Sequence, residues 1–292
     1  MKFDIEGRMK NLRLPDGRTA LLYSIFEAVM NGIQAIEERF PGNSATQGSI
    51  TIDVEKANKA VLRIFVSDNG IGLNERHFDS FNVCDTMTKA DIGGRGVGRL
   101  VWLKAFRKVE VESIYHEGDK AHRLSFTFRP ELEDSRADLK LNPPVQASRY
   151  PTGTTITLSQ LTDANAQITP VFLARSLCHH FFPIFIAGNM PKLSIRIGTR
   201  DIDIIEYLKS RMEVAETEDI KINEVIGDIN IIHVYVDPKI AKQLSNSILL
   251  TAQGRVVESI EVEKKFALRE LRVDQNGGWG RPPTRTSAAR IF

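Results

Sequence analysis

The chain has 292 residues, of which 42% are hydrophobic and 26% are charged. This composition is typical of a globular protein and excludes a disordered or fibrous chain. The 39 basic and 37 acidic residues nearly balance, so net charge neither requires nor excludes a nucleic-acid partner. The sequence has no run of 18 uncharged apolar residues and does not open on an apolar stretch like that of a signal peptide. We therefore expect a cytoplasmic protein with no membrane partner.

The length of the chain predicts two domains rather than one. A change from helical periodicity to short strands places the boundary near residue 188, which gives a first domain of 1–187 and a smaller second domain of 188–292. Cys84 and Cys178 are far apart and form no CxxC pair. They indicate buried thiols rather than a disulfide framework or a zinc site.

Apolar residues at steps of three and four predict an amphipathic helix over 21–38. A short helix is expected over 99–106, directly after a run of glycines. The polar segment of about 74–98 is expected to be mobile and outside the core, and 131–147 reads as a loop. Runs rich in β-branched residues predict strands over 50–55, 61–67, 109–114, 122–128 and 154–158.

The rest of the chain predicts one apolar helix over 169–187, followed by short strands around a second helix over 238–244. The tail from residue 276 lacks periodicity and reads as a loose end. It also fits a cut through a longer protein. The strands are expected over 193–197, 202–206, 229–236 and 248–250.

Four short motifs occur in a fixed order, and together they indicate an ATP site. Each one alone is as typical of an ordinary turn or a solvated helix face, so their order and residue types carry the inference. The motifs are Glu27-xxx-Asn31-xxx-Ala35, Asp68-Asn69-Gly70-Ile71-Gly72, Gly93-Gly94-Arg95-Gly96-Val97-Gly98 and Gly153-Thr154-Thr155.

The first two motifs supply polar groups suited to a nucleotide. Glu27, Asn31 and Ala35 share one stripe of a helix, opposite its apolar face. An amide oxygen is a hard ligand suited to Mg²⁺, and a carboxylate one turn away can orient or deprotonate a water. Asp68 ends a strand and can accept a hydrogen bond from an amino group such as that of adenine. Gly70 and Gly72 allow close approach of a flat ligand.

The other two motifs fit the phosphates and a bridging water. The glycines of 93–98 precede a helix whose N-terminus favours an anion such as phosphate. Their pattern is neither the dinucleotide GxGxxG nor a P-loop. A hydroxyl of Thr154 or Thr155 can bond a water that also touches Asp68 and the base.

This motif series resembles the GHKL superfamily of ATPases, which includes DNA gyrase, the ninety-kilodalton heat-shock chaperones, histidine kinases, MutL and MORC-type proteins. The resemblance covers 21–158. It implies a Bergerat fold, an α/β sandwich with a mixed sheet, followed by a smaller α/β transducer-like domain. The implied activity is slow Mg²⁺-dependent ATP hydrolysis that drives lid closure, over about 78–97, and rearrangement of domains or subunits.

The resemblance also implies a role for each motif residue. Asn31 would ligate Mg²⁺, Glu27 would be the general base and Asp68 would recognise adenine, with Ala35 beside the nucleotide. Gly70 and Gly72 would lie under the base, and Thr155, with Thr154 as the second candidate, would bridge the water. The lid hinge and phosphate cradle would be formed by Gly93, Gly94, Arg95, Gly96, Val97 and Gly98.

Two further segments resemble the MutL and MORC branch. Thr86-Met87-Thr88-Lys89 is similar to a Thr-Ser-Lys lid sequence, so Thr88 and Lys89 would contact the nucleotide. Residues 248–257 are similar to the asparagine-glycine-arginine turn of the transducer domain. The residue that senses the γ-phosphate is open between Lys264, Lys265 and a position beyond Phe292.

Two alternatives stay open, a histidine kinase-like catalytic domain and an ATP-sensing module without turnover. Glu27 favours a hydrolase, because histidine kinases often have Asn at this place. His179 and His180 lie on an apolar helix, where a structural role is expected over that of a phosphate acceptor. An ATP-dependent homodimer and a DNA or protein client are compatible with the resemblance, which does not choose among clients.

Overall fold

The computed structural model divides the chain into two compact units, Met1–Ala174 with Gly188–Ile204 and Arg175–Ala187 with Ile205–Phe292. The residues that the structure describes are 17–57, 60–82, 98–129, 135–163, 166–223, 227–236, 247–252, 255–261 and 287–291.

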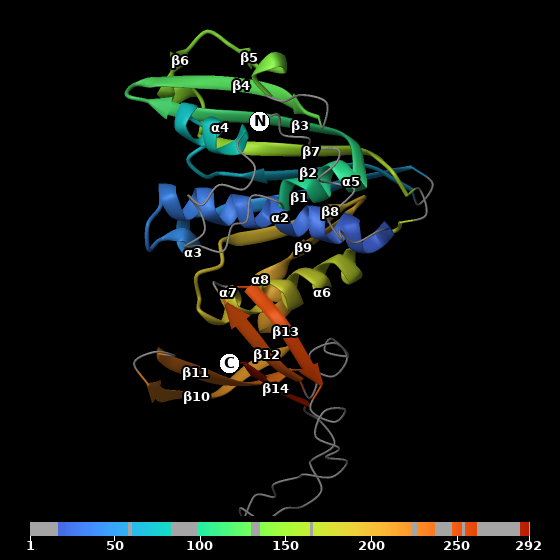
Figure 1. Cartoon of the computed structure of the whole chain (residues 1–292), viewed down its shortest axis with the longest axis vertical. Coiled ribbons are helices and arrows are strands. Elements are labelled where there is room, and N and C mark those ends of the chain that lie inside the picture. The colour runs from blue at the N-terminus through green and yellow to red at the C-terminus, as the bar shows by residue number, and fades with distance from the viewer. Residues whose placement is uncertain are drawn as a thin grey trace, which may run out of the picture. The chain divides into compact units, whose positions relative to one another are not determined.

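The first unit is built on a mixed nine-stranded sheet in the order β5-β4-β3-β7-β2-β1-β8-β9, with β6 paired to β4 (Figure 1). Only the pairing of β1 with β8 is parallel among these described strands. The strands are β1 Ser49–Ala57, β2 Ala60–Asp68, β3 Phe106–Glu117, β4 Lys120–Phe128, β5 Lys140–Leu141, β6 Val145–Gln146, β7 Gly153–Leu161, β8 Lys192–Ile197 and β9 Arg200–Asp203.

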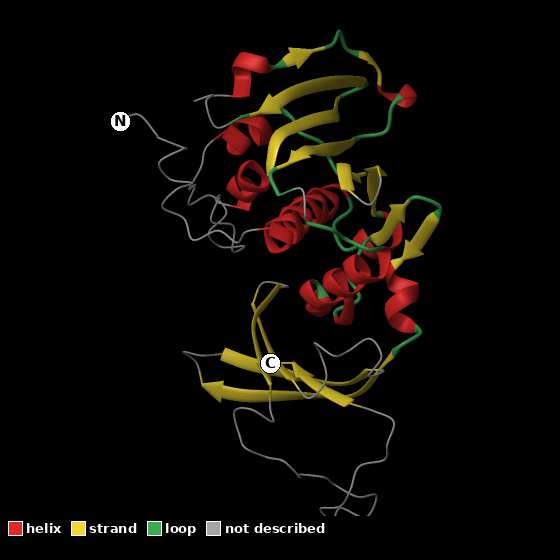
Figure 2. Ribbon diagram, turned by 90° about the vertical axis from the view of Figure 1, so that its right-hand side faces the viewer, coloured by secondary structure: helices red, strands yellow, loops and turns green. Residues whose placement is uncertain are grey.

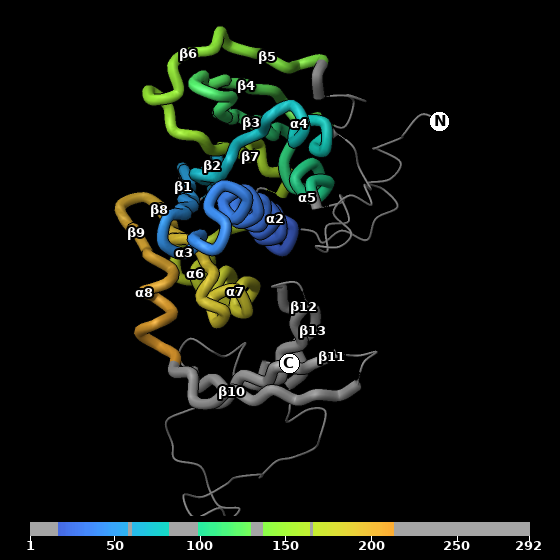
Figure 3. Tube along the Cα trace, turned by 90° about the vertical axis from the view of Figure 1, so that its left-hand side faces the viewer, coloured from blue at the N-terminus to red at the C-terminus, as the bar shows by residue number. Residues whose placement is uncertain are grey.

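Three helices of this unit lie on one face of the sheet, as Figures 2 and 3 show from two sides. They are α2 Gly17–Arg39, α4 Glu75–Asn82 and α5 Gly98–Ala105, and the shorter α3 Ser44–Gln47 follows α2. Two 3₁₀ helices, η2 Ser135–Asp138 and η3 Ala147–Arg149, flank β5 and β6. Alternate strand residues such as Ile64 and Val66 of β2 are buried, because the side chains of a strand point to opposite faces in turn.

The long helix α2 is the core helix of this unit. Among the described residues it alone is long and apolar enough to cross a membrane, yet 61% of its most apolar window is buried inside the protein. Leu21, Ile25, Val29 and Ile36 are fully buried. This burial accounts for the apolar character of α2, and nothing in the described part of the chain indicates a membrane protein.

The helix α4 lies in a segment that the sequence predicted to be mobile, and for 75–82 that prediction is wrong. Phe78 is buried, and its ring lies 5.1 Å from that of Phe126 on β4. Phe81 lies 5.2 Å from Phe126 and 5.3 Å from Phe128. Two aromatic side chains at helical spacing therefore bring an otherwise polar segment into the core. Residues 83–97 are outside the described part of the chain.

The helix α5 is fixed to α2 by the buried side chain of Trp102. Its indole Nε1 donates a hydrogen bond to the carbonyl of Ser24 over 2.9 Å. The Ser24 hydroxyl in turn donates to the carbonyl of Val101 over 3.4 Å. These contacts set the position of α5, whose first residue is Gly98, against α2 one turn before Glu27.

The second unit contains a five-stranded sheet in the order β10-β11-β14-β12-β13. The strands β12 and β14 are parallel and the other neighbours are antiparallel. The predicted strands 229–236 and 248–250 correspond to β11 and β12, whereas the predicted helix 238–244 is outside the described residues. The bounds are β10 Met212–Asn223, β11 Gly227–Val236, β12 Ser247–Ala252, β13 Arg255–Glu261 and β14 Ser287–Ile291.

Helices α6 Pro170–His180 and α7 Phe182–Ile186 replace the single helix predicted over 169–187, and α8 Ile204–Lys209 follows β9. The predicted single helix is interrupted at Phe181, after which α7 begins anew. Pro183 has no N–H to continue the earlier helix, but it is tolerated in the first turn of a new one. Cys178 is buried as predicted, and burial raises the pKa of its thiol to about 12. Burial also lowers the pKa of His179.

The structure divides the chain differently from the boundary expected near residue 188. The strand β8 pairs in parallel with β1, and Ile195 opposite Ile52 is fully buried in the first sheet. The strand β14 lies in the tail that was expected to be loose, and it pairs with both β11 and β12. Both differences arise from pairings between residues far apart in sequence, which local periodicity does not report.

Candidate active site

The stripe of Glu27, Asn31 and Ala35 is the partly accessible line of α2. All three residues are intermediate in exposure, while their neighbours Ala28 and Gly32 are buried. A helix that is buried on most sides thus leaves a narrow polar line open. This agrees with the predicted division of α2 into a packing face and a chemical face.

Asp68 ends β2 on the face of the sheet that α2 covers. Its Oδ1 accepts a hydrogen bond from the N–H of Gly70 over 2.7 Å, and the backbone N–H of Thr154 also donates to the carboxyl. Burial raises the pKa of Asp68 to about 6, against the opposing effects of these two N–H groups and of the Arg39 charge. The carboxyl therefore lies where its ionised form is costly and has capacity to accept a further hydrogen bond.

The bend after Asp68 packs tightly against α2. A Cβ added at Gly70 would lie 2.5 Å from the Cβ of Ala35, and the N–H of Ile71 donates to the carbonyl of Ala35 over 3.0 Å. A Cβ added at Gly32 would lie 3.2 Å from the Cβ of Asp68. The sequence placed Ala35 beside the nucleotide. In the structure its small side chain also leaves room for the bend.

Gly72 adopts a backbone conformation that other residues avoid. Its φ is +81°, and an added Cβ would lie 2.2 Å from the carbonyl oxygen of Ile114. The bend therefore passes β3 at a distance that only glycine allows. The N–H of Leu73 then donates to the hydroxyl of Ser113 on β3 over 2.8 Å, which fixes the end of the bend.

Asn69 and Thr152 hold the bend although sequence reasoning gave neither a role. Asn69 accepts from the N–H of Ser49 through Oδ1 over 2.7 Å and donates to the carbonyl of Gln47 through Nδ2 over 2.8 Å. The buried hydroxyl of Thr152 donates to the carbonyl of Gly70 over 2.7 Å. An Asp-Asn-Gly sequence signals a turn, but it does not show that the middle residue joins two other segments.

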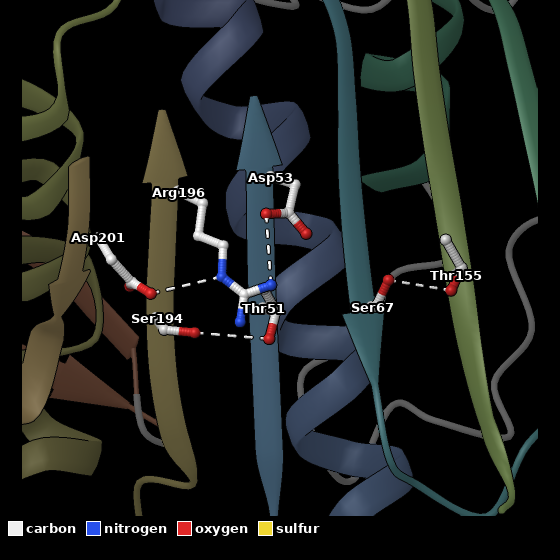
Figure 4. Close-up of polar contacts among 7 residues, drawn as sticks. All are labelled: Thr51, Asp53, Ser67, Thr155, Ser194, Arg196 and Asp201. Atoms are coloured by element: carbon white, nitrogen blue, oxygen red, sulfur yellow. Dashed lines mark hydrogen bonds and ion pairs between the residues drawn. The ribbon is translucent and has the colours of Figure 1, made fainter. Parts of the chain in front are cut away.

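The two threonines of the fourth motif lie on opposite faces of the sheet. Thr154 pairs with Asp68 and Thr155 pairs with Ser67 in the register of β7 with β2. Directly opposed residues share a face, so Thr154 lies on the side of Asp68. The Thr155 hydroxyl instead lies 2.9 Å from that of Ser67 on the other face (Figure 4). The choice of Thr155 over Thr154 as the water-bridging residue is thus corrected, because strand alternation turns Thr155 away.

Gly98 opens α5, as the third motif predicted for the start of a helix. Thr88, Lys89, Gly93, Gly94, Arg95, Gly96 and Val97 lie outside the described residues, and their roles stay predictions. In the described part of the chain no group of three or more His, Cys, Asp or Glu side chains could hold a metal ion by itself. The partly accessible Asn31 amide fits an ion that takes its other ligands from phosphate and water.

A cavity of about 1020 Å³ opens on the other side of the sheet, with Asp53, Phe65 and Arg196 among its lining residues. None of Glu27, Asn31 and Asp68 lines it. Arg196 of this lining lies 3.8 Å from Asp53 and 3.4 Å from Asp201, as Figure 4 shows. We assign no role to this cavity.

Comparison with known proteins agrees with this geometry. Residues 17–163 match the family of histidine kinase-, DNA gyrase B- and HSP90-like ATPases. The chain belongs to this ATPase family. The matched segment starts with α2 and ends just after β7, so it contains all four motifs. No curated protein matches the chain. The mixed sheet covered by α2, α4 and α5 is consistent with the Bergerat fold of this family.

Replacement of Asp68 by Asn should stabilise the protein above neutral pH. The pKa of Asp68 is about 6 in the folded protein, against an ordinary value of 3.8 for the unfolded chain. Folding therefore disfavours the ionised carboxylate, and the free energy of unfolding falls as pH rises from about 4 to above 6. The cost at pH 8 is roughly 3 kcal/mol. Thermal unfolding of Asp68→Asn should therefore give a higher midpoint than the wild type at pH 8.

The gain should shrink toward pH 4.5, where the wild-type carboxyl is protonated. Asp201→Asn, on the exposed second face of the sheet, is the control and should change the midpoint little at either pH. A difference between Asp68→Asn and wild type that does not vary with pH would contradict the burial of an ionised carboxylate.

Comparison of Gly70→Ala with Gly118→Ala should show whether tight packing or backbone strain costs more folding stability. The added Cβ collides with Ala35, so the free energy of unfolding should fall by about 2 kcal/mol or more. Gly118→Ala is the matched control, because Gly118 has a φ of +61° and open space around an added Cβ. Denaturant unfolding should rank Gly70→Ala as the less stable variant, and the reverse order would argue against close contact of the bend with α2.

Proposed function

We propose that this chain binds Mg²⁺-ATP between the open stripe of α2 and the bend after β2, and that it hydrolyses ATP slowly. The observation that carries the proposal is the partly buried carboxyl of Asp68 beside Gly32, one residue after Asn31 on the same helix. Two backbone N–H groups only partly offset the burial of Asp68. An adenine amino group would supply a further donor to the carboxylate. Membership of an ATPase family supports adenine as the base.

Each residue of the site has a chemical role in this proposal. The oxygen of the Asn31 amide would hold Mg²⁺, which supplies charge neutralisation to the phosphates when it is bound. Glu27 would accept a proton from a water as the water oxygen forms a bond to the γ-phosphorus. The bond from that phosphorus to the β–γ bridging oxygen would break, and ADP would leave. Thr154 replaces Thr155 as the candidate for the water-bridging hydroxyl.

The conformational part of the proposal goes beyond the site. ATP would order residues 83–97, the part of the expected lid of about 78–97 that follows α4, and change the placement of the second, transducer-like unit or of a second subunit. Residues 83–97 and the candidate sensors Lys264 and Lys265 are outside the described residues, so this part stays a prediction. Cytoplasmic localisation, a homodimer, a DNA or protein client and kinship with MutL or MORC proteins also stay predictions.

Calorimetric titration with a non-hydrolysable ATP analogue and Mg²⁺ tests the binding site. Asp68→Asn replaces the acceptor oxygen pair with an amide that also donates, so affinity should fall by at least about tenfold. The variant is expected to be at least as stable as the wild type, so the loss would not reflect unfolding. Unchanged affinity of Asp68→Asn would remove the adenine assignment.

Phosphate release tests the role of Glu27. Glu27→Gln should bind the ATP analogue within about twofold of the wild type, whereas phosphate release at saturating ATP should fall by about 100-fold or more. Glu55→Gln is the control, because Glu55 forms an exposed ion pair with Arg63 over 2.7 Å and such pairs contribute little.

Three results would contradict ATP hydrolysis with Glu27 as base. Turnover that is equal in Glu27→Gln and wild type, and above the rate without protein, would reject Glu27 as the base. Wild-type turnover no higher than the rate without protein, with ATP still bound, would indicate an ATP-sensing module. Acid-labile phosphate on the protein after incubation with labelled ATP would indicate a histidine kinase.

A further inference from the structure

Arg39, the last residue of α2, joins three segments around Asp68. Its Nη1 donates to the carbonyl of Asn69 over 2.6 Å and to that of Thr152 over 3.3 Å. Its guanidinium carbon also lies 4.6 Å from the ring centre of Phe40. One partly buried side chain therefore ties the end of α2 to the bend after β2 and to the residue before β7.

These contacts differ from those of an ordinary basic residue at a helix end. Such a residue interacts with the last carbonyls of its own helix or with water. Arg39 instead bonds carbonyls 30 and 113 residues away in sequence, and burial lowers the pKa of its guanidinium. Partial removal of a guanidinium from water has a cost, so its placement between two carbonyls, where its charge acts on Asp68, calls for a role.

The charge of Arg39 acts on Asp68. It opposes the effect of burial on that carboxyl, together with the N–H groups of Gly70 and Thr154. Glu38, the neighbour of Arg39 on α2, is paired with His77 of α4 at 3.0 Å. Tyr115 of β3 lies against Gly72 of the bend, where burial and then the charges of Glu117 and Glu75 raise its pKa. Of all these groups, Arg39 is the one whose charge acts on Asp68.

We propose that Arg39 is a positioning residue for base recognition, which holds the two segments beside Asp68 and keeps its carboxylate a hydrogen-bond acceptor. The inference rests on the proposed ATP site and deepens it. An ionised carboxylate accepts from the amino group of a 6-aminopurine such as adenine. A protonated carboxyl can donate to the oxygen of a 6-oxopurine such as hypoxanthine. Arg39 would therefore favour adenine over 6-oxo bases at neutral pH.

The test compares Arg39→Met with Arg39→Lys in the full chain, with ADP and IDP as ligands because the hydrolysis step does not consume them. Dissociation constants are measured with Mg²⁺ between pH 5 and 8.5. The wild type should lose ADP affinity below a midpoint near pH 6. In Arg39→Met the midpoint should move to higher pH by about 0.3 unit or more, and the preference for ADP over IDP at pH 7 should fall by about twofold or more.

Arg39→Lys keeps the positive charge but not the planar fork. It should therefore retain most of the wild-type midpoint and base preference even if both affinities fall. Should Arg39→Met fail to fold, Arg39→Gln replaces it, because its amide can still donate to the carbonyl of Asn69 without the charge. The same two readouts then apply.

Equal weakening of ADP and IDP, with the pH midpoint unmoved, would show a purely structural role for Arg39 and overturn the inference. That result leaves the ATP site intact. A wild-type protein that binds neither ADP nor ATP would instead overturn the proposed function and the inference with it. The two failures are distinguished by the wild-type titration alone.

Discussion

The contact of the bend after β2 with α2 is the constraint on which the site depends. Gly70 lies against Ala35, and the N–H of Ile71 donates to the carbonyl of Ala35. This contact holds the strand end that carries Asp68 beside the helix that carries Asn31. Packing of this kind transmits small changes directly, because protein interiors have few voids to absorb them. The spacing of the polar groups therefore follows from two small residues at one crossing.

Charge adds a second constraint that opposes stability. Burial disfavours the ionised form of Asp68, and the N–H groups of Gly70 and Thr154 with the Arg39 charge only partly offset it. A binding site commonly retains such a cost because the ligand supplies the missing partner. The aromatic packing of α4 and the Trp102 bond of α5 to Ser24 stabilise the surroundings without contributing an ionisable group. The protein thus separates its stabilising contacts from its chemically active ones.

Much of the first unit could be predicted from its sequence. The steps of three and four in 21–38 predicted α2, and β-branched runs predicted β1, β2, β3, β4 and β7, because local periodicity directly reports which face is buried. The order of the motifs indicated the ATPase family, which the match over 17–163 confirms. The helix α4 was missed because two aromatic residues in a polar segment are a weak signal. The pairing of β8 with β1 was missed because it joins distant residues.

Local spacing by itself determined the helix, the strands and the residue types that can bind a nucleotide. Tertiary structure alone decided which threonine shares a face with Asp68, that Ala35 makes room for Gly70, and that Arg39 reaches the carbonyls of Asn69 and Thr152. The physical reason is that strand register and close packing are fixed by segments far apart in the chain. A sequence pattern reports the period of a segment but not its partner.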